Sequence, residues 1–187
     1  MDKRAKILAA ALKLLVEQGF HSTPTSAIAK AAGVANGTLF HYFKTKDELI
    51  LGLYADIKKD SLRKILQGIE GQQSVKAKVK TIWYNSINWS ITEKEKHNFK
   101  QQFMHSPYAT QLSQEDLEEE LKLFSDMIKE GIEKKILKDI PIDLIYHITH
   151  YQMLAIVSYL NLNPHLIEDA DFYELAFELF WDNIKRV

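Results

Sequence analysis

Apolar side chains recur every three or four residues along most of this 187-residue chain. This spacing is that of one face of an α-helix, and no convincing strand pattern accompanies it. The seven glycines and four prolines are too few for a turn-rich all-β fold. The sequence therefore predicts an all-α protein of about nine helices, the longer ones near residues 46–67, 74–91, 92–105, 115–136, 142–160 and 171–185.

The composition restricts what such a protein can do. Hydrophobic residues make up 46% and charged residues 26% of the chain, which is typical of a globular protein. Cysteine is absent, which excludes disulfides, thiolate metal sites and a cysteine nucleophile. The net charge of −1 excludes a uniformly basic nucleic-acid binder. However, residues 1–50 hold seven Lys or Arg and four Asp or Glu, so this end carries +3 and the remainder −4. That distribution suits an anion-binding head on a near-neutral body.

The chain shows neither a membrane-spanning segment nor a targeting segment. No apolar run reaches about 18 residues, the length that indicates a membrane span. The N-terminus passes from the charged residues Asp2, Lys3, Arg4 and Lys6 directly into amphipathic sequence, without a signal-peptide cleavage pattern. We expect a cytoplasmic protein with no membrane partner.

Helix start and stop signals are dense between residues 23 and 49. Thr23 is a suitable N-cap for a helix with Pro24 in its first position, and Gly33 ends that helix. Thr45 and Glu48 have the spacing of a capping box, in which each side chain accepts a hydrogen bond from the backbone N–H of the other residue. This box is expected to open the long fourth helix.

The helix ending at Gly33 and a further short helix, over about residues 35–43, are joined by a tight turn. This arrangement is that of a helix-turn-helix, whose second helix enters the major groove of DNA. We expect Val34, Leu39 and Phe43 to pack inward. The polar residues expected to face outward are Asn36, Thr38, His41 and Tyr42.

This segment resembles the N-terminal domain of the TetR family of bacterial transcriptional regulators. The resemblance extends over about residues 4–50 and is specific in order and spacing. It rests on Glu17-Gln18-Gly19-Phe20, Ile28-Ala29, Ala32-Gly33-Val34, Gly37-Thr38-Leu39, Tyr42-Phe43 and Lys44-x-Lys46-x-Glu48-Leu49. It implies a DNA-binding domain over residues 1–46 and a helical ligand-binding and dimerisation domain over residues 47–187.

The resemblance also implies two groups of DNA contacts. The positions of base-edge contacts hold Asn36, Gly37, Thr38 and His41. The positions of phosphate contacts hold Thr25, Ser26, Tyr42, Lys44 and Lys46. Hydroxyl and ammonium groups are ordinary phosphate donors, and an Asn amide can pair with adenine.

Three positions depart from the family's pattern. Phe40 replaces a usual Tyr, Asn36 replaces a common Lys, and Pro24 replaces a frequent hydroxyl residue. Each change removes a polar or charged group that could otherwise approach the DNA backbone.

The last two long helices, near residues 142–160 and 171–185, are apolar nearly all round. A helix with two apolar faces is buried on two faces. The second face is best explained by another copy of the chain, in a two-fold symmetric four-helix bundle. We expect Phe177 and Phe180 at this interface. The alternative is that both helices are central core helices of a monomer.

The resemblance implies a ligand cavity in the C-terminal domain. Aromatic and methionine side chains with a few polar groups suit a bulky, mostly apolar molecule. The alternative for such a stripe is ordinary core packing. The candidate lining residues are Trp83, Tyr84, Ile87, Phe103, Met104, Tyr108, Phe124, Met127, Tyr146, His147, His150 and Tyr151.

The sequence contains few motifs that indicate a metal site or an enzyme. His147 and His150 lie three residues apart, a spacing that can bind a metal with one more ligand, but a packed pair is favoured. The chain contains no Gly-rich phosphate loop, no Gly-x-Ser-x-Gly and no His-Glu-x-x-His. We expect no cofactor and no enzymatic activity.

Together these features predict a ligand-responsive, homodimeric DNA-binding regulator. It is expected to be a repressor that a small, mostly apolar molecule releases from a palindromic operator in double-stranded DNA. The alternative is a DNA-binding dimer whose C-terminal body binds a partner protein instead of a small molecule.

Overall fold

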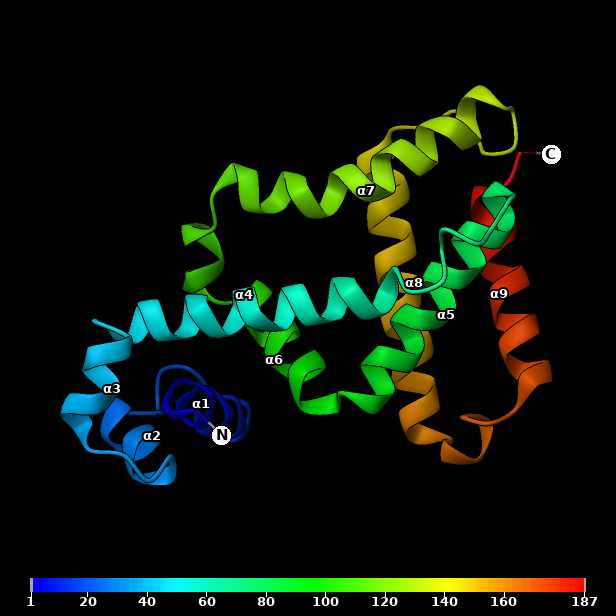
Figure 1. The fold of residues 1–187 in the computed structure, drawn as a ribbon. Helices are drawn as coiled ribbons and strands as arrows, with labels where there is room; N and C mark the ends of the chain where they lie inside the picture. Colours follow the sequence, from blue (N-terminus) through cyan, green and yellow to red (C-terminus); the bar gives the residue numbers. More distant parts are fainter. Residues whose placement is uncertain (1, 187) are drawn as a thin grey trace. The chain divides into compact units, whose positions relative to one another are not determined.

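The computed structural model describes residues 2–186, apart from the side chains of residues 114–121 and 123. This described backbone forms nine α-helices and two short 3-10 helices (η1 and η2), and it holds no β-strand, only an isolated bridge between Leu137 and Lys185. The all-α prediction is therefore confirmed. The elements are α1 (Lys3–Gln18), α2 (Thr25–Ala31), α3 (Asn36–Tyr42), α4 (Lys46–Ile65), α5 (Val75–Thr92), α6 (Lys94–Met104), η1 (Pro107–Gln111), α7 (Gln114–Glu133), α8 (Ile142–Leu162), η2 (Pro164–Leu166) and α9 (Ala170–Ile184) (Figure 1).

The chain divides into two compact units. The head unit contains the residues up to Asp60 together with Glu93–Leu112, so α6 and η1 join the first three helices. The body unit contains Ser61–Thr92 and the chain from Ser113 onward. The helix α4 contributes residues to both units. The predicted boundary at residue 46 separates a DNA-binding domain from a ligand-binding and dimerisation domain. This division by function stays a prediction.

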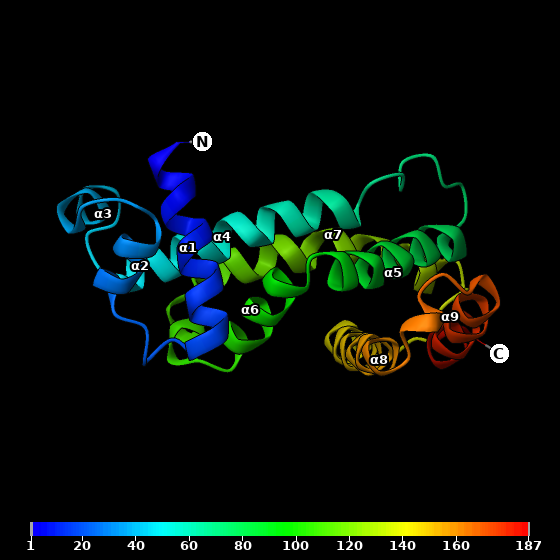
Figure 2. The same ribbon diagram turned by 90° about the horizontal axis from the view of Figure 1, so that it is seen from below.

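The head unit is built around α1, which contacts α2, α3 and α6 (Figure 2). One apolar face of α1 turns inward, and its residues Ile7, Ala11 and Leu15 are fully buried because they recur at a spacing of four. Leu39 of α3 and Phe99 of α6 are fully buried as well. This core holds the short helices α2 and α3 against the longer helix α1.

The start of α2 differs from the prediction. The Thr23 hydroxyl does not cap α2 but lies 2.8 Å from the carbonyl oxygen of Gly19 and 3.2 Å from that of Leu14. Pro24 is the residue before α2, and its carbonyl oxygen accepts a hydrogen bond from the N–H of Ala27. The predicted N-cap is wrong because the fully buried Thr23 side chain turns back to satisfy carbonyl groups at the end of α1.

The predicted capping signal at α4 is confirmed in one half and shifted in the other. The N–H of Glu48 donates to the Thr45 hydroxyl oxygen at 3.0 Å. The Glu48 carboxylate accepts instead from the N–H of Lys44, at 2.7 Å. Both bonds satisfy backbone donors around the helix start.

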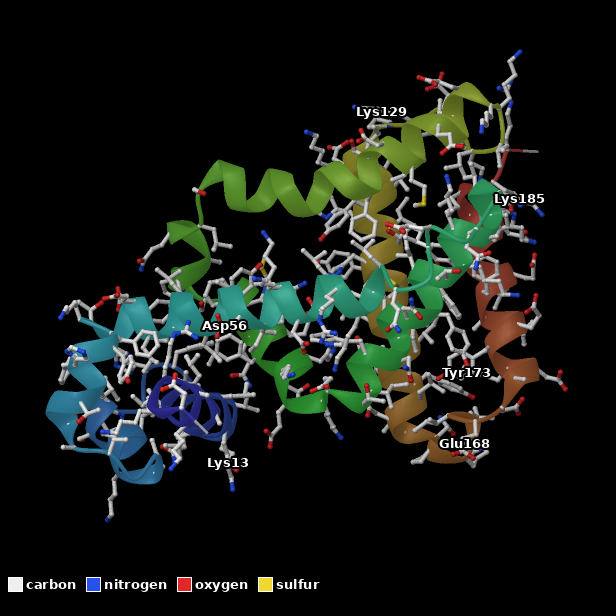
Figure 3. All side chains as sticks on the ribbon, in the orientation of Figure 1. Lys13, Asp56, Lys129, Glu168, Tyr173 and Lys185 are labelled. Carbon is white, nitrogen blue, oxygen red and sulfur yellow. The ribbon has the colours of Figure 1, made fainter. Side chains whose placement is uncertain are left out.

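In the body unit, α5 contacts α7, α8 and α9. Trp83 of α5 is almost fully buried, and its ring centre lies 5.5 Å from that of Phe177, 6.1 Å from that of Phe180 and 6.3 Å from that of Tyr173. All three partners belong to α9, from which Tyr173 reaches toward α5 (Figure 3). These four rings form the centre of the body core.

The two faces of α9 are therefore assigned differently from the prediction. Phe177 and Phe180 are 0% and 4% exposed, so they lie in the core of their own unit and not at a subunit interface. Leu175 and Leu179, one turn apart, are 61% and 59% exposed. Because helix spacing separates residues 177 and 180 from 175 and 179, the apolar surface of α9 has an inner and an outer face.

The helix α8 also carries an outer apolar stripe. Its exposed large apolar side chains follow one another at spacings of three, four and eight residues, which places them on one face. They are Leu144, Ile148, Tyr151, Tyr159 and Leu162. We call this stripe together with Leu175 and Leu179 the outer apolar face. Within the part of the chain that the structure describes, no helix is long and apolar enough to cross a membrane.

Candidate nucleic-acid interface

A glycine turn sets the geometry of α2 and α3. Gly33 has φ +66°, in the left-handed region that residues with a side chain rarely adopt. Its N–H donates to the carbonyl oxygen of Lys30, and the N–H of Val34 donates to that of Ala29. These bonds close the last turn of α2 and redirect the chain into α3.

The inward side of α3 is packed as predicted. Leu39 is fully buried and Phe43, at the end of the helix, is nearly so, while Val34 is half-buried. An apolar underside of this kind fixes the rotation of a short helix about its own axis. The opposite side of α3 must then face away from the core.

The predicted base-contact residues lie around the rest of α3, with Gly37 and His41 on the side away from Leu39. Asn36, Gly37 and His41 are exposed, and Thr38 is half-buried. Apart from the surrounding chain of α3 itself, no atom lies within 4 Å of the position that a Cβ atom would take on Gly37, so the backbone there is open to close approach. The structure thus brings all four residues together on α3.

The predicted phosphate contacts flank this surface. Thr25 and Ser26 occupy the first turn of α2, Tyr42 the last turn of α3, and Lys44 the connection to α4. Ser26 and Lys44 are exposed, and Thr25 and Tyr42 are half-buried. The fifth residue, Lys46, differs, because its ammonium group donates a hydrogen bond to the carbonyl oxygen of Phe20.

An ion pair that sequence reasoning missed lies beside α3. The two terminal nitrogens of Arg4 donate to the two carboxylate oxygens of Asp56 at 2.8 and 3.2 Å. Hydrogen bonding to Asp56 raises the pKa of Arg4 above its ordinary value. The Arg4 guanidinium carbon also lies 5.6 Å from the centre of the Phe43 ring. No sequence spacing could have revealed a pair that is separated by 52 residues.

The connection between α1 and α2 is held by an aromatic cluster. The ring centre of Phe20 lies 5.4 Å from that of Phe99 and 5.6 Å from that of Tyr108. Burial raises the pKa of Tyr108, and the nearby Asp47 carboxylate raises it further. The cluster joins α6 and η1 to the helices that carry the candidate interface.

The residues predicted to line a ligand cavity are divided between the two units. Phe103, Met104 and Tyr108 belong to the head unit, and the other nine belong to the body unit. Phe103 is fully buried and stacks on Tyr54 with the ring centres 4.1 Å apart, while Met104 is exposed. These three residues have packing or surface positions within the head.

In the body unit, Trp83 and Ile87 are core residues with almost no exposed surface. On α8 the rings of Tyr146 and His150 stack 6.0 Å apart, and His147 and Tyr151 are exposed. Phe124 and Met127 on α7 are half-buried.

A hollow of about 350 Å³ lies on the body unit along α5 and the segment before it. Tyr84 is the predicted ligand residue in its lining, which consists of Gln72, Ala77, Lys80, Thr81, Tyr84 and Asn85. Among the described side chains, no three His, Asp or Glu residues are grouped so as to hold a metal ion.

Two family models match the chain. Residues 7–53 match the bacterial regulatory proteins of the tetR family, and residues 75–185 match a tetracyclin repressor-like C-terminal domain. The fatty acid metabolism regulator protein of Bacillus subtilis is 32% identical over 77 residues, which cover 41% of this chain and 40% of that protein. The chain thus matches about two-fifths of that relative's length.

Solved structures agree over all or nearly all of the chain. A crystal structure from Shewanella sp. PV-4, described as a TetR family transcription regulator, has a TM-score of 0.89 and 30% identity over all of both chains. FadR of Bacillus subtilis in complex with stearoyl-CoA has a TM-score of 0.77 and 21% identity, covering 94% of this chain and 96% of that one, which shows likeness of fold. The chain therefore belongs to the TetR family of bacterial regulatory proteins and is a transcriptional regulator of TetR type.

Proposed function

We propose that this regulator is a homodimeric repressor that reads a palindromic operator with α3 and is released by a small, mostly apolar effector. One observation supports DNA reading above all others. Gly37 and His41, four residues apart, share an exposed face of α3, and Asn36 is exposed at the first residue of this helix, while Leu39 is fully buried. A helix with a fixed rotation presents the same groups to every operator.

The side chains on this face have the chemistry that base reading needs. The Asn36 amide can pair with an adenine, and the Thr38 methyl group can touch a thymine methyl group. The open backbone at Gly37 allows α3 to approach the bases. Phosphate contacts from Thr25, Ser26, Tyr42, Lys44 and Lys46 would set the register of α3 on the duplex.

The outer apolar face supports a dimer. Large exposed apolar surfaces on a soluble domain mark interaction sites. A second copy of the chain offers the same stripes on α8 and α9, which is what a two-fold interface requires. Two recognition helices related by this symmetry would read half-sites about 34–36 Å apart.

Effector release is supported by the relatives. The B. subtilis relative is a fatty acid metabolism regulator, and B. subtilis FadR was solved with stearoyl-CoA. An effector weakens DNA binding only if it prefers a conformation that fits the operator less well. We assign the mechanical link to α4, because it contributes residues to both units.

The decisive experiment is selection of duplex DNA from a random pool by the purified protein at physiological salt. We expect a palindrome whose half-sites are separated by about one helical turn. His41→Ala, on the exposed face of α3, should select a different or relaxed sequence. Recovery of no specific sequence by a well-folded dimer would contradict the proposal and favour a body that binds a partner protein.

Once an operator is known, stearoyl-CoA is the first effector probe. We expect it to weaken operator binding and to leave binding of unrelated DNA nearly unchanged. An unaltered operator affinity at high stearoyl-CoA concentration would exclude stearoyl-CoA as the effector and leave the DNA-binding proposal standing.

A further inference from the structure

The C-terminal end of α3 packs against α4. Phe43, the residue that follows α3, is almost fully buried. A Cβ atom on Gly52 of α4 would lie 3.2 Å from Cε1 and 3.8 Å from Cδ1 of the Phe43 ring. The ring therefore sits in a notch that exists because α4 has no side chain at this position.

A second contact holds the Phe43 ring from α1. The Arg4 guanidinium lies over the ring, with 5.6 Å between its central carbon and the ring centre. The same guanidinium donates two hydrogen bonds to Asp56. Asp56 lies on α4 (Figure 3). Gly52 and Asp56 are four residues apart and share one face of α4. Phe43 is thus enclosed by Gly52 and by an Arg4 side chain that Asp56 orients. We call these four residues the Phe43 clamp.

The ion pair in this clamp is better suited to orientation than to stability. The Arg4 and Asp56 side chains are 41% and 48% exposed, and exposed ion pairs contribute little to the free energy of unfolding. Two parallel hydrogen bonds nevertheless fix the plane of a guanidinium group. Without Asp56, Arg4 would be free to leave the Phe43 ring.

We propose that Arg4 and Asp56 are positioning residues for DNA recognition, which hold the end of α3 at a fixed angle to α4 through Phe43. This inference rests on the proposed reading of operator bases by α3. Neither residue has to touch DNA for the clamp to act. A shift of α4 within the head unit would be passed to α3 through the same four residues.

The direction in which Asp56→Asn changes the affinity for DNA distinguishes the positioning role from a simple effect of charge. Asp56→Asn removes a negative charge from the head unit, which by charge alone should strengthen binding to DNA. Loss of the clamp should instead weaken operator binding on the order of tenfold. The slope of log affinity against log salt concentration should stay unchanged, because no phosphate contact is lost.

Glu17→Gln is the matched control, because Glu17 is an exposed acid of the same unit outside the clamp. It should leave operator binding unchanged or slightly stronger. Arg4→Met is the second test variant and should weaken operator binding as Asp56→Asn does, again without a change in slope. A slope reduced by about 0.9 in Arg4→Met would identify a phosphate contact and overturn the positioning role.

Amide hydrogen exchange of the full-length chain tests the clamp without DNA. Asp56→Asn should speed exchange in the last turn of α3, where the N–H of Phe43 donates to the carbonyl oxygen of Leu39, and leave α1 protected. The double variant Arg4→Met with Asp56→Asn should show no further increase. Unchanged exchange at α3 overturns the clamp. If no operator is recovered, the proposed function fails, while exchange still decides whether the clamp exists.

Discussion

The ammonium group of Lys46 donates a hydrogen bond to the backbone carbonyl oxygen of Phe20. Lys46 is the first residue of α4, and Phe20 belongs to the connection between α1 and α2. The bond therefore ties the start of α4 to the base of the helix-turn-helix. An ammonium group has three donors, so this bond leaves two for the phosphate contact that we propose.

Replacing Lys46 separates these two roles. Lys46→Ala should lower the free energy of unfolding by about 1–2 kcal/mol, because a part-buried charged hydrogen bond is lost. It should also reduce the salt slope of DNA binding by about 0.9. Lys44 is exposed. Lys44→Ala should therefore reduce the salt slope of DNA binding by the same amount and leave the free energy of unfolding unchanged. Urea unfolding and DNA titrations at several salt concentrations measure both; an unchanged slope in Lys46→Ala would restrict Lys46 to a structural role.

The exposed imidazole of His41 is expected to read a base. His41→Ala should reduce discrimination at one base pair of each half-site by about 1–3 kcal/mol and leave other positions unchanged. The measurement is competition binding with every single-base variant of the operator. Equal loss of affinity for all variants would mean that His41 contributes to binding without reading sequence.

The cap at the start of α4 is expected to stabilise the head unit. Thr45→Ala removes the hydroxyl that accepts from the N–H of Glu48, so the free energy of unfolding should fall by about 0.5–2 kcal/mol. Thr45→Ser keeps this hydroxyl and is the control, with little loss expected. Urea unfolding at equal protein concentration compares the three proteins. Equal stability of Thr45→Ala and the parent chain would show that the bond contributes nothing net.

The sequence predicts the helix-turn-helix well because its determinants are local. A left-handed glycine at position 33 and a buried Leu39 at the right spacing specify the turn and the rotation of α3. The prediction that Phe177 lies at a subunit interface is wrong, because Phe177 and Leu179 are both apolar and only packing against Trp83 decides which is buried. The Arg4–Asp56 pair depends on contacts between distant segments, which periodicity cannot reveal.

The residues predicted to line a ligand cavity also show what sequence periodicity cannot reveal. Aromatic residues at helical spacing are typical of a ligand cavity and equally of a core, and Trp83 and Phe103 are buried in the cores of their own units. Their division between two units could not be inferred from spacing on single helices.

The outer apolar face gives the sharpest test of the proposed dimer. Leu179 is 59% exposed, so Leu179→Lys places a charge on the surface of one copy and should leave the fold intact. At a two-fold interface that charge would occur twice in apolar surroundings, where an unpaired charge is strongly unfavourable. We expect a helical monomer in sedimentation experiments, with operator binding weakened because the two half-sites are no longer bound together.

Two further variants make this result specific. Phe177→Lys buries its charge within the body core and should unfold the protein, seen as lost helical circular dichroism. Glu168→Lys, at an exposed position just before α9 (Figure 3), should leave the oligomeric state unchanged. If Leu179→Lys sediments as a dimer, the outer face of α9 does not form the interface, and the second copy must bind elsewhere on the body unit. A folded Leu179→Lys monomer beside an unfolded Phe177→Lys would assign one face of α9 to association and the other to folding.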